Sequence, residues 1–147
     1  MSTRGDIQDW CVTRLTSQVT TLRSVKALAS IEEFRGLVRN LPAAGVVITD
    51  DADSGENAPP GEQFIHLSIH VIVAARRFRA DTGAGLSDDD GVYELLDSIW
   101  DAFKEQTPTS ADHELFYRGS SLISTLEDLA NGLLLWDAEY MTGTQLS

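Results

Sequence analysis

The sequence has few basic residues, one cysteine and no long apolar run, and each shortage argues against a class of protein. Its 147 residues include 11 Lys and Arg against 23 Asp and Glu, which gives a formal net charge of −12 at pH 7. Phosphate backbones and anionic lipids attract proteins mainly through Lys and Arg. The excess of acid therefore argues against sequence-specific nucleic-acid binding and against docking on a membrane surface.

Secretion and membrane insertion are also disfavoured. The single cysteine, Cys11, has no partner for an internal disulfide, which favours a reducing, intracellular compartment. The first residues, MSTRGDIQDW, lack the apolar segment of a signal peptide, and no apolar run approaches the roughly 20 residues that a bilayer span needs. Length and an ordinary 42% hydrophobic content predict one domain over 1–147, with flexible ends at about 1–5 and 143–147.

Hydrophobic periodicity predicts helices and strands in the order α-β-α-β-β-α-β-β. The clearest strand has apolar residues at odd positions from Ile65 to Ala75, with His66, Ser68 and His70 among the even ones. Two adjacent pairs of strands indicate an α+β fold, in which helices pack on a mixed, mostly antiparallel β-sheet. The predicted ranges are 7–22, 24–29, 31–38, 43–50, 65–75, 92–103, 114–118 and 133–140.

The histidines do not predict a metal site. His66 and His70 share one face of a strand, but four residues separate them, which is roughly 13 Å at 3.3 Å per residue. One ion cannot bridge that distance, and His113 lies in another segment. We interpret the pair as polar residues on the more solvated face of a sheet.

Other patterns fall short of a catalytic, calcium or phosphate site. The acidic loop 51–62 has Gly and Glu where a calcium loop needs a ligand and then a glycine. Gly83 and Gly85 precede a helix, but Asp88–Asp90 occupy the place that a phosphate would take. Gly119-Ser120-Ser121 lacks the second glycine of a nucleophile elbow, and Cys11 fits a small core residue. We predict no catalytic, metal, ligand or cofactor site and no enzyme activity.

A basic cluster at the end of the long strand predicts an interface. Arg76, Arg77 and Arg79 are three of the eleven basic residues in an acidic chain. They are either a solvated strand end or a contact surface. In a ring of identical subunits, a basic edge can meet an acidic face of the next copy. We place Arg76, Arg77 and Arg79, with Asp51 and Asp53 of the acidic loop, at an interface with another subunit or with a second protein.

Four segments carry a resemblance to a known family. The stretches "LPAAGVVITDD", "FIHLSIHVIVAARRFR", "GVYELLDSIWDAF" and "GLLLWDAEYMTG" resemble Mu-type prophage tail proteins, and their order is similar to the tail terminators of lambda-type phages. The likeness spans roughly residues 7–142. The chain departs from it at "WDAF" and "RRF", which are bulkier or more charged than the family pattern.

The resemblance implies a structural role in a phage virion. A tail terminator forms a ring, here expected to be hexameric, that caps the tail tube, stops its polymerisation and offers a surface for head–tail joining. The implied partners are further copies of the chain, the tail tube protein and a neck or head-completion protein. An acidic ring would also let genome DNA pass without binding it.

Two other functions remain open from the sequence. A head-completion or neck adaptor protein is a ring-forming building block of similar size. A small-ligand-binding regulatory domain could use the same fold, with His66, Ser68 and His70 as the candidates for a polar pocket. An enzyme that uses these histidines is a third, weaker possibility.

Overall fold

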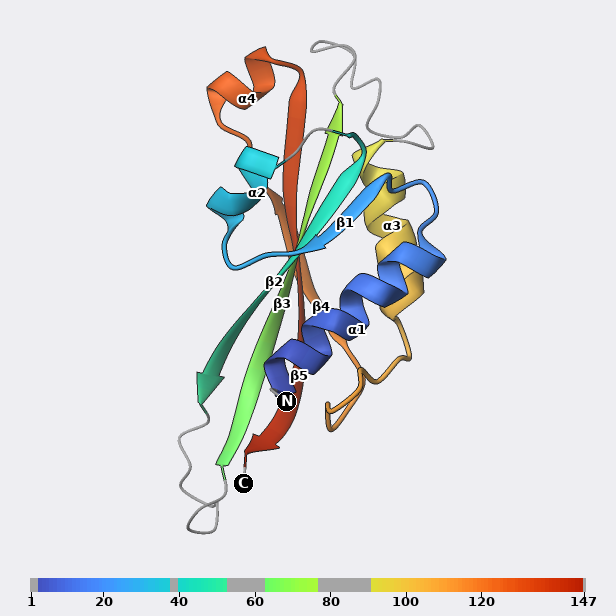
Figure 1. Cartoon of the computed structure of the whole chain (residues 1–147), viewed down its shortest axis with the longest axis vertical. Coiled ribbons are helices and arrows are strands. Elements are labelled where there is room, and N and C mark those ends of the chain that lie inside the picture. Colours follow the sequence, from blue (N-terminus) through green and yellow to red (C-terminus); the bar gives the residue numbers. More distant parts are fainter. Residues whose placement is uncertain (1–2, 38–39, 53–62, 77–90, 147) are drawn as a thin grey trace.

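A strongly twisted five-stranded sheet with the strand order β1-β2-β3-β5-β4 forms the centre of the protein (Figure 1). The computed structural model describes residues 3–37, 40–52, 63–76 and 91–146. The elements are α1 (Thr3–Gln18), β1 (Ser24–Ala27), α2 (Ile31–Leu37), β2 (Ala43–Ala52), β3 (Gln63–Arg76), α3 (Val92–Phe103), β4 (Phe116–Leu122), α4 (Leu126–Ala130) and β5 (Leu133–Leu146).

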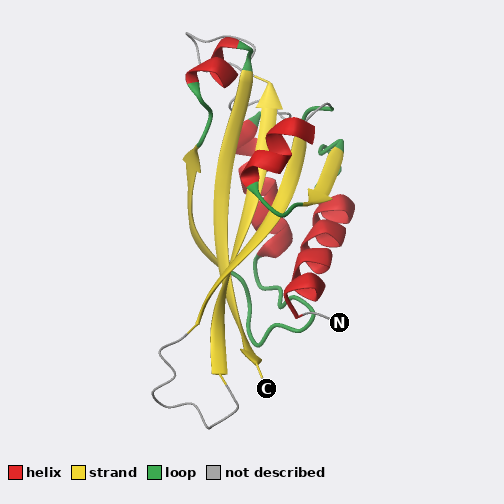
Figure 2. Ribbon diagram, turned by 60° about the vertical axis from the view of Figure 1, so that its left-hand side comes forward, coloured by secondary structure: helices red, strands yellow, loops and turns green. Residues whose placement is uncertain are grey.

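The pairing of the strands confirms the predicted α+β class with a mixed sheet. β1 runs parallel to β2, whereas the β2–β3, β3–β5 and β5–β4 pairs are antiparallel. β4 and the short β1 form the two edges of the sheet, as Figure 2 shows. The two longest strands, β3 and β5, lie side by side at its centre.

The helices α1 and α3 cover one face of the sheet and enclose the larger core. The odd residues of β3 point to this face, as the alternation predicts, and all six from Ile65 to Ala75 are buried. From α3, Leu95, Ile99 and Phe103 complete the core, because they recur every three or four residues along one side of the helix. These residues define the inward face of α3, and the helix has the predicted bounds 92–103.

A smaller core lies on the opposite face, beneath α2. Phe34 packs there with Ile72, Ala74 and Leu135. A capping interaction begins α2: the Glu33 amide donates to the Ser30 hydroxyl, and the Glu33 carboxylate accepts from the backbone N–H of the residue before Ser30. α2 covers only part of this face. The residues of β3 that point to this face before Ile72 therefore lie outside the smaller core.

Gly45 lets α2 and the β1–α2 connection approach the sheet closely. A Cβ on this residue would lie 2.2 Å from Leu28 Cδ1 and 2.9 Å from Phe34 Cδ2. Both distances are shorter than real Cβ contacts. The absence of a side chain at Gly45 is therefore a packing requirement of the smaller core.

The structure corrects the predicted helices and strands in four ways. α1 ends at Gln18, because the chain turns at Thr20 and Thr21; the side chain of Val19 is still buried. β4 runs over 116–122 instead of 114–118, because it follows the pairing with β5. The short α4 lies where we expected a loop.

The fourth correction concerns the first helix and the last strand, which extend beyond the predicted start at residue 7 and the predicted end at residue 140. α1 begins at Thr3, and β5 continues to Leu146. The extension of β5 is held by Thr142 and Thr144, whose buried hydroxyls donate to the carbonyls of His113 and Ser110. The connection before β4 thus fixes the last third of β5 in the sheet.

Candidate functional site

The predicted interface residues that the structure describes lie at opposite ends of the sheet. Arg76 is the exposed last residue of β3 and pairs with Leu133. Asp51 lies near the end of β2 and pairs with His66, ten residues earlier on β3. Ten residues of strand span about 33 Å. Arg77, Arg79 and Asp53 lie outside the described residues.

This separation excludes an ion pair between Arg76 and Asp51 within one chain. β3 begins at the lower end of the sheet and finishes at the upper end (Figure 1). Charges of opposite sign at two ends of one molecule can meet only between molecules. The arrangement is therefore compatible with the expected contact between copies or with the tube.

The three polar residues of β3 lie along one uncovered stretch of the sheet. His66 is exposed, and Ser68 and His70 are half-buried, all on the face opposite α1 and α3. They form a row along one strand and do not converge around a cavity. The pocket lining that a ligand-binding domain would need is not formed by these three residues.

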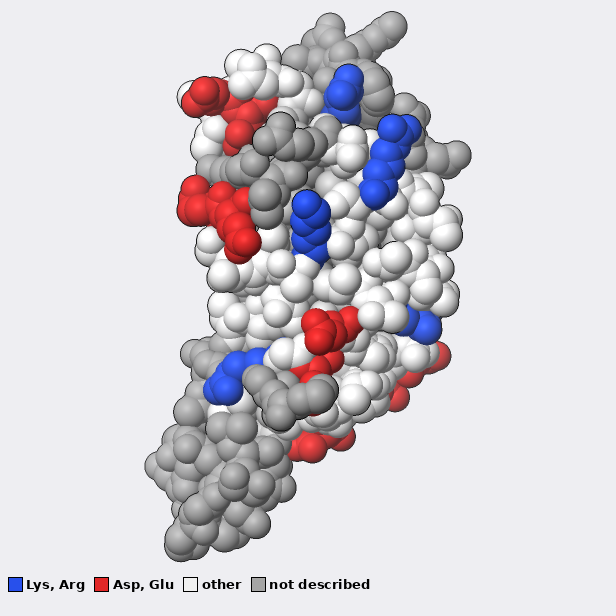
Figure 3. Space-filling model, in the orientation of Figure 1, with Lys and Arg blue, Asp and Glu red and all other residues white. Residues whose placement is uncertain are grey.

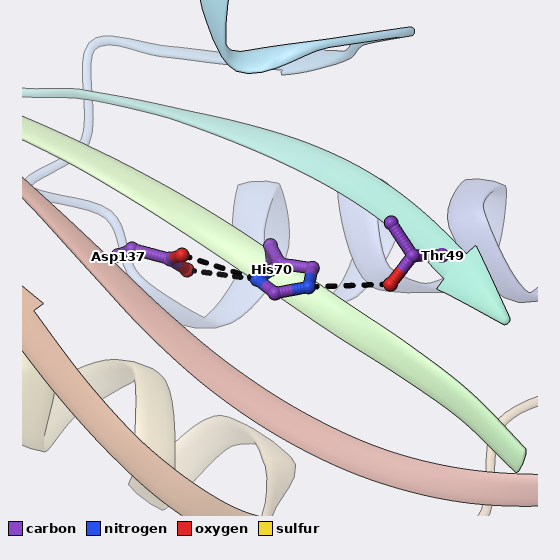
Figure 4. A network of polar contacts seen from close by, with 3 residues as sticks. All are labelled: Thr49, His70 and Asp137. Carbon is purple, nitrogen blue, oxygen red and sulfur yellow. Dashed lines mark hydrogen bonds and ion pairs between the residues drawn. The ribbon is translucent and has the colours of Figure 1, made fainter. Parts of the chain in front are cut away.

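His70 is the centre of a polar network across three strands (Figure 4). Its Nδ1 lies 3.1 Å from both carboxylate oxygens of Asp137 on β5, and its Nε2 lies 3.3 Å from the hydroxyl of Thr49 on β2. With Nδ1 protonated, the ring donates to Asp137. Nε2 then accepts from Thr49 when the ring is neutral, or donates to it when the ring is charged.

The network raises the pKa of His70 above its ordinary value. The hydrogen bond to Asp137 is the main cause, and the negative charges of Asp137 and Glu139 add to it, while partial burial acts in the opposite direction. Asp137 and His70 also form an ion pair when the ring is protonated. The site is thus a charge-assisted clamp between the two central strands.

The hydroxyl of Thr49, the imidazole of His70 and the carboxylate of Asp137 are also the three kinds of group that form a nucleophilic triad. Acyl transfer additionally needs free N–H groups aimed at the developing oxyanion. Around His70, β3 pairs with β2 on one side and with β5 on the other, so the N–H groups of this strand are used within the sheet. The arrangement therefore favours a structural clamp over a catalytic centre.

The remaining candidates have structural environments. Cys11 is buried in the larger core, and burial raises the pKa of its thiol well above the usual range. Its reactive thiolate is therefore scarce at neutral pH. His113 donates from Nδ1 to the carbonyl of Glu114, and its Nε2 lies against Gly143.

Within the described ranges, no three His, Cys, Asp or Glu side chains gather closely enough to hold a metal ion. None of the described helices combines the length and the apolar character that crossing a bilayer demands. The described surface includes charged strand ends, two sheet edges and a polar stretch of sheet. These are features of an interaction domain.

Comparison with known proteins identifies the family. A family model described as "Phage tail terminator protein" matches residues 6–147, almost the whole chain. The chain therefore belongs to the phage tail terminator family, and it is a structural component of a phage tail. No curated protein matches it in a sequence search.

Proposed function

We propose that the protein forms a ring, with six copies as the expected number, that caps the tail tube and stops its growth. Membership of the terminator family over residues 6–147 is the observation that carries this proposal. The ring would also offer a surface to a neck or head-completion protein. It would place the protein at the head–tail junction of the virion, after assembly in the host cytoplasm.

Charge supports the proposal in two ways. Arg76 and Asp51 lie at opposite ends of the sheet, which suits head-to-tail contacts between copies or a contact with the tube protein. The net charge of −12 suits a channel through which DNA slides, because like charges suppress phosphate binding.

The direct test is electron microscopy of lysates from a phage or prophage that lacks the gene. Overlong tubes without heads are the expected result, because tube growth has lost its stop. Tails of normal length beside unattached, filled heads would instead assign the protein to the head side of the neck. Intact virions would contradict both structural roles.

A charge reversal tests the predicted interface residues. Replacing Arg76, Arg77 and Arg79 together by Glu should leave the fold intact but prevent rings from forming on tube ends. The fold is checked by circular dichroism and thermal melting, and the rings by electron microscopy beside the wild type. Arg76→Glu and Lys104→Glu, which each reverse one exposed basic residue, are a matched pair for the effect of a single charge reversal at the strand end and elsewhere. Unchanged rings in the triple variant would remove these arginines from the interface.

A further inference from the structure

The large hydrophobic side chains that stay exposed in the described part of the chain gather around β4. Four of the five fall within residues 116–126, and the fifth, Tyr93, packs edge-on against Trp136, the β5 partner of Leu122. The five are Tyr93, Phe116, Tyr117, Leu122 and Leu126. Single exposed hydrophobic residues are common, but several of them on and next to one strand indicate an interaction surface.

β4 is also an edge strand. Its only strand neighbour within the described residues is β5, so its outer row of backbone N–H and C=O groups has no ladder partner there. Tyr117 contacts Trp100 and Tyr140 on the face covered by helices, whereas Phe116 pairs with Met141 on the other face. A strand added to this edge would gain main-chain hydrogen bonds and apolar contacts on both faces.

The two edges of the sheet differ in charge. Exposed acids flank the β4 side: Glu94 and Asp97 on α3, Glu114 before β4, and Glu127 on α4. At the opposite edge, Arg23 and Lys26 are exposed before and within β1, and Figure 3 shows basic side chains over this region. β4 also carries one exposed base, Arg118, and α2, which follows β1, carries the exposed acids Glu32 and Glu33. The complementary charges are therefore Arg23 and Lys26 at the β1 edge and Glu114 and Glu127 beside β4.

We propose that the β4 edge of one copy binds the β1 edge of the next copy, so that neighbouring sheets join side by side. This inference rests on the proposed ring function and names the surface that builds the ring. Because β1 and β4 are opposite edges of one sheet, the contact is head-to-tail and repeats from copy to copy until the ring closes. In this arrangement the ends of the sheet, with Arg76 and Asp51, are left for the contact with the tube protein, the other partner expected for these residues.

Disulfide trapping tests the proposal. The native Cys11 is fully buried, so it does not compete with introduced thiols. The double variants Lys26→Cys/Leu122→Cys and Lys26→Cys/Tyr117→Cys should each be oxidised as concentrated protein and in lysates that contain assembled tails. We expect at least one double variant to give a ladder of cross-linked oligomers that ends at the ring size, read on non-reducing gels.

The single variants are the controls. In a head-to-tail contact, the one introduced cysteine of a single variant faces a native residue of the next copy, so no disulfide forms. Cross-linked dimers of Leu122→Cys or Tyr117→Cys alone would show that β4 meets β4 and would overturn the proposal. Monomers in both double variants, in protein and in lysates, would overturn it as well. Cross-links to the tube protein in their place would assign the β4 edge to that partner.

A mixing experiment gives a second, independent readout. Leu122→Glu disables the β4 edge, and Arg23→Glu/Lys26→Glu disables the β1 edge. Each variant alone should stay monomeric, whereas an equal mixture should form a dimer and nothing larger, because one intact contact remains. Light scattering measures the masses, and thermal melting confirms the folds. A mixture that stays monomeric would contradict the proposal. These results do not depend on tail length, so a failure of the terminator function in the deletion test is seen separately.

Discussion

The two faces of the sheet differ in what covers them, and this difference separates stability from interaction. On one face, α1 and α3 bury the odd residues of β3 along its whole length. On the other, α2 covers Ile72 and Ala74, while none of the described helices lies over the stretch with His66, Ser68 and His70. The covered face therefore holds most of the apolar burial that stabilises the domain.

The less covered face replaces apolar packing with a smaller number of directed contacts. His70 joins β3 to both neighbouring strands through Thr49 and Asp137. A charge-assisted contact stabilises by about 1 kcal/mol, whereas a large buried side chain contributes about 2–3 kcal/mol. Because these contacts join the strands without a covering helix, this face of the sheet remains accessible to a partner.

The largest expected effect comes from the covered face. Phe103 is fully buried and contacts both Trp10 and Tyr140, with ring centroids 5.9 and 5.0 Å apart. Phe103→Ala should lower the free energy of unfolding by about 3–5 kcal/mol, since it removes a large side chain from a closed core. Urea unfolding measures the loss. Tyr93→Ala, an aromatic change on the exposed side of the same helix, should cost about 1 kcal/mol. Equal losses would contradict the inward face assigned to α3.

The second-largest expected loss of unfolding free energy comes from the smaller core, where α2 covers the opposite face of the sheet. Gly45→Ala should cost about 1–3 kcal/mol, because the new methyl group overlaps Leu28 and Phe34. The double variant Gly45→Ala/Leu28→Ala should lose less than the sum of the two single changes, since removing Leu28 makes room for the methyl. Thermal and urea unfolding of all three variants measure the coupling. Strict additivity would show that the close approach at Gly45 does not determine the packing.

The sequence predicts the covered face better than the uncovered one, for a physical reason. α3 and β3 are amphipathic over many residues, so a local pattern identifies both the element and its inward side. β4 is short, and its position depends on pairing with β5. α4 is shorter still. The capping box of Thr125 and Asp128 is a local signal that identifies α4, but a five-residue helix has no periodicity to support it.

The clamp of His70 depends on strand register, which no local pattern contains. Across the sheet, His70 pairs with Glu139, and Asp137 pairs with Ile72, so the contact is diagonal. Thr49 is likewise paired with Ser68 and reaches His70 diagonally. The alternation of β3 predicts the face on which His70 lies, but its partners follow only from the order and register of three strands.

The third effect depends on pH. The pKa of His70 is raised in the folded protein, so its stabilisation is fully present below the unfolded value of 6.5 and is lost as the pH rises through the folded value. Asp137→Asn should therefore cost about 1 kcal/mol near pH 5.5 and clearly less near pH 8.5. Urea unfolding of both proteins at the two pH values measures the difference. A cost that does not change with pH would show that the ion pair is not formed.

The smallest expected effect belongs to the other histidine of the same strand and face. His66 is exposed, whereas His70 is half-buried and bound to Asp137, so the two form a matched pair. His66→Gln should change the free energy of unfolding by less than about 0.5 kcal/mol at any pH, because it removes a solvated side chain. His70→Gln should reproduce the pH-dependent loss of Asp137→Asn, since it removes the same ion pair. If His66→Gln is instead as costly as His70→Gln, the uncovered stretch of the sheet contributes to stability in a way that its contacts do not explain. If His66→Gln leaves stability unchanged but alters rings on tube ends, this stretch is part of a contact surface.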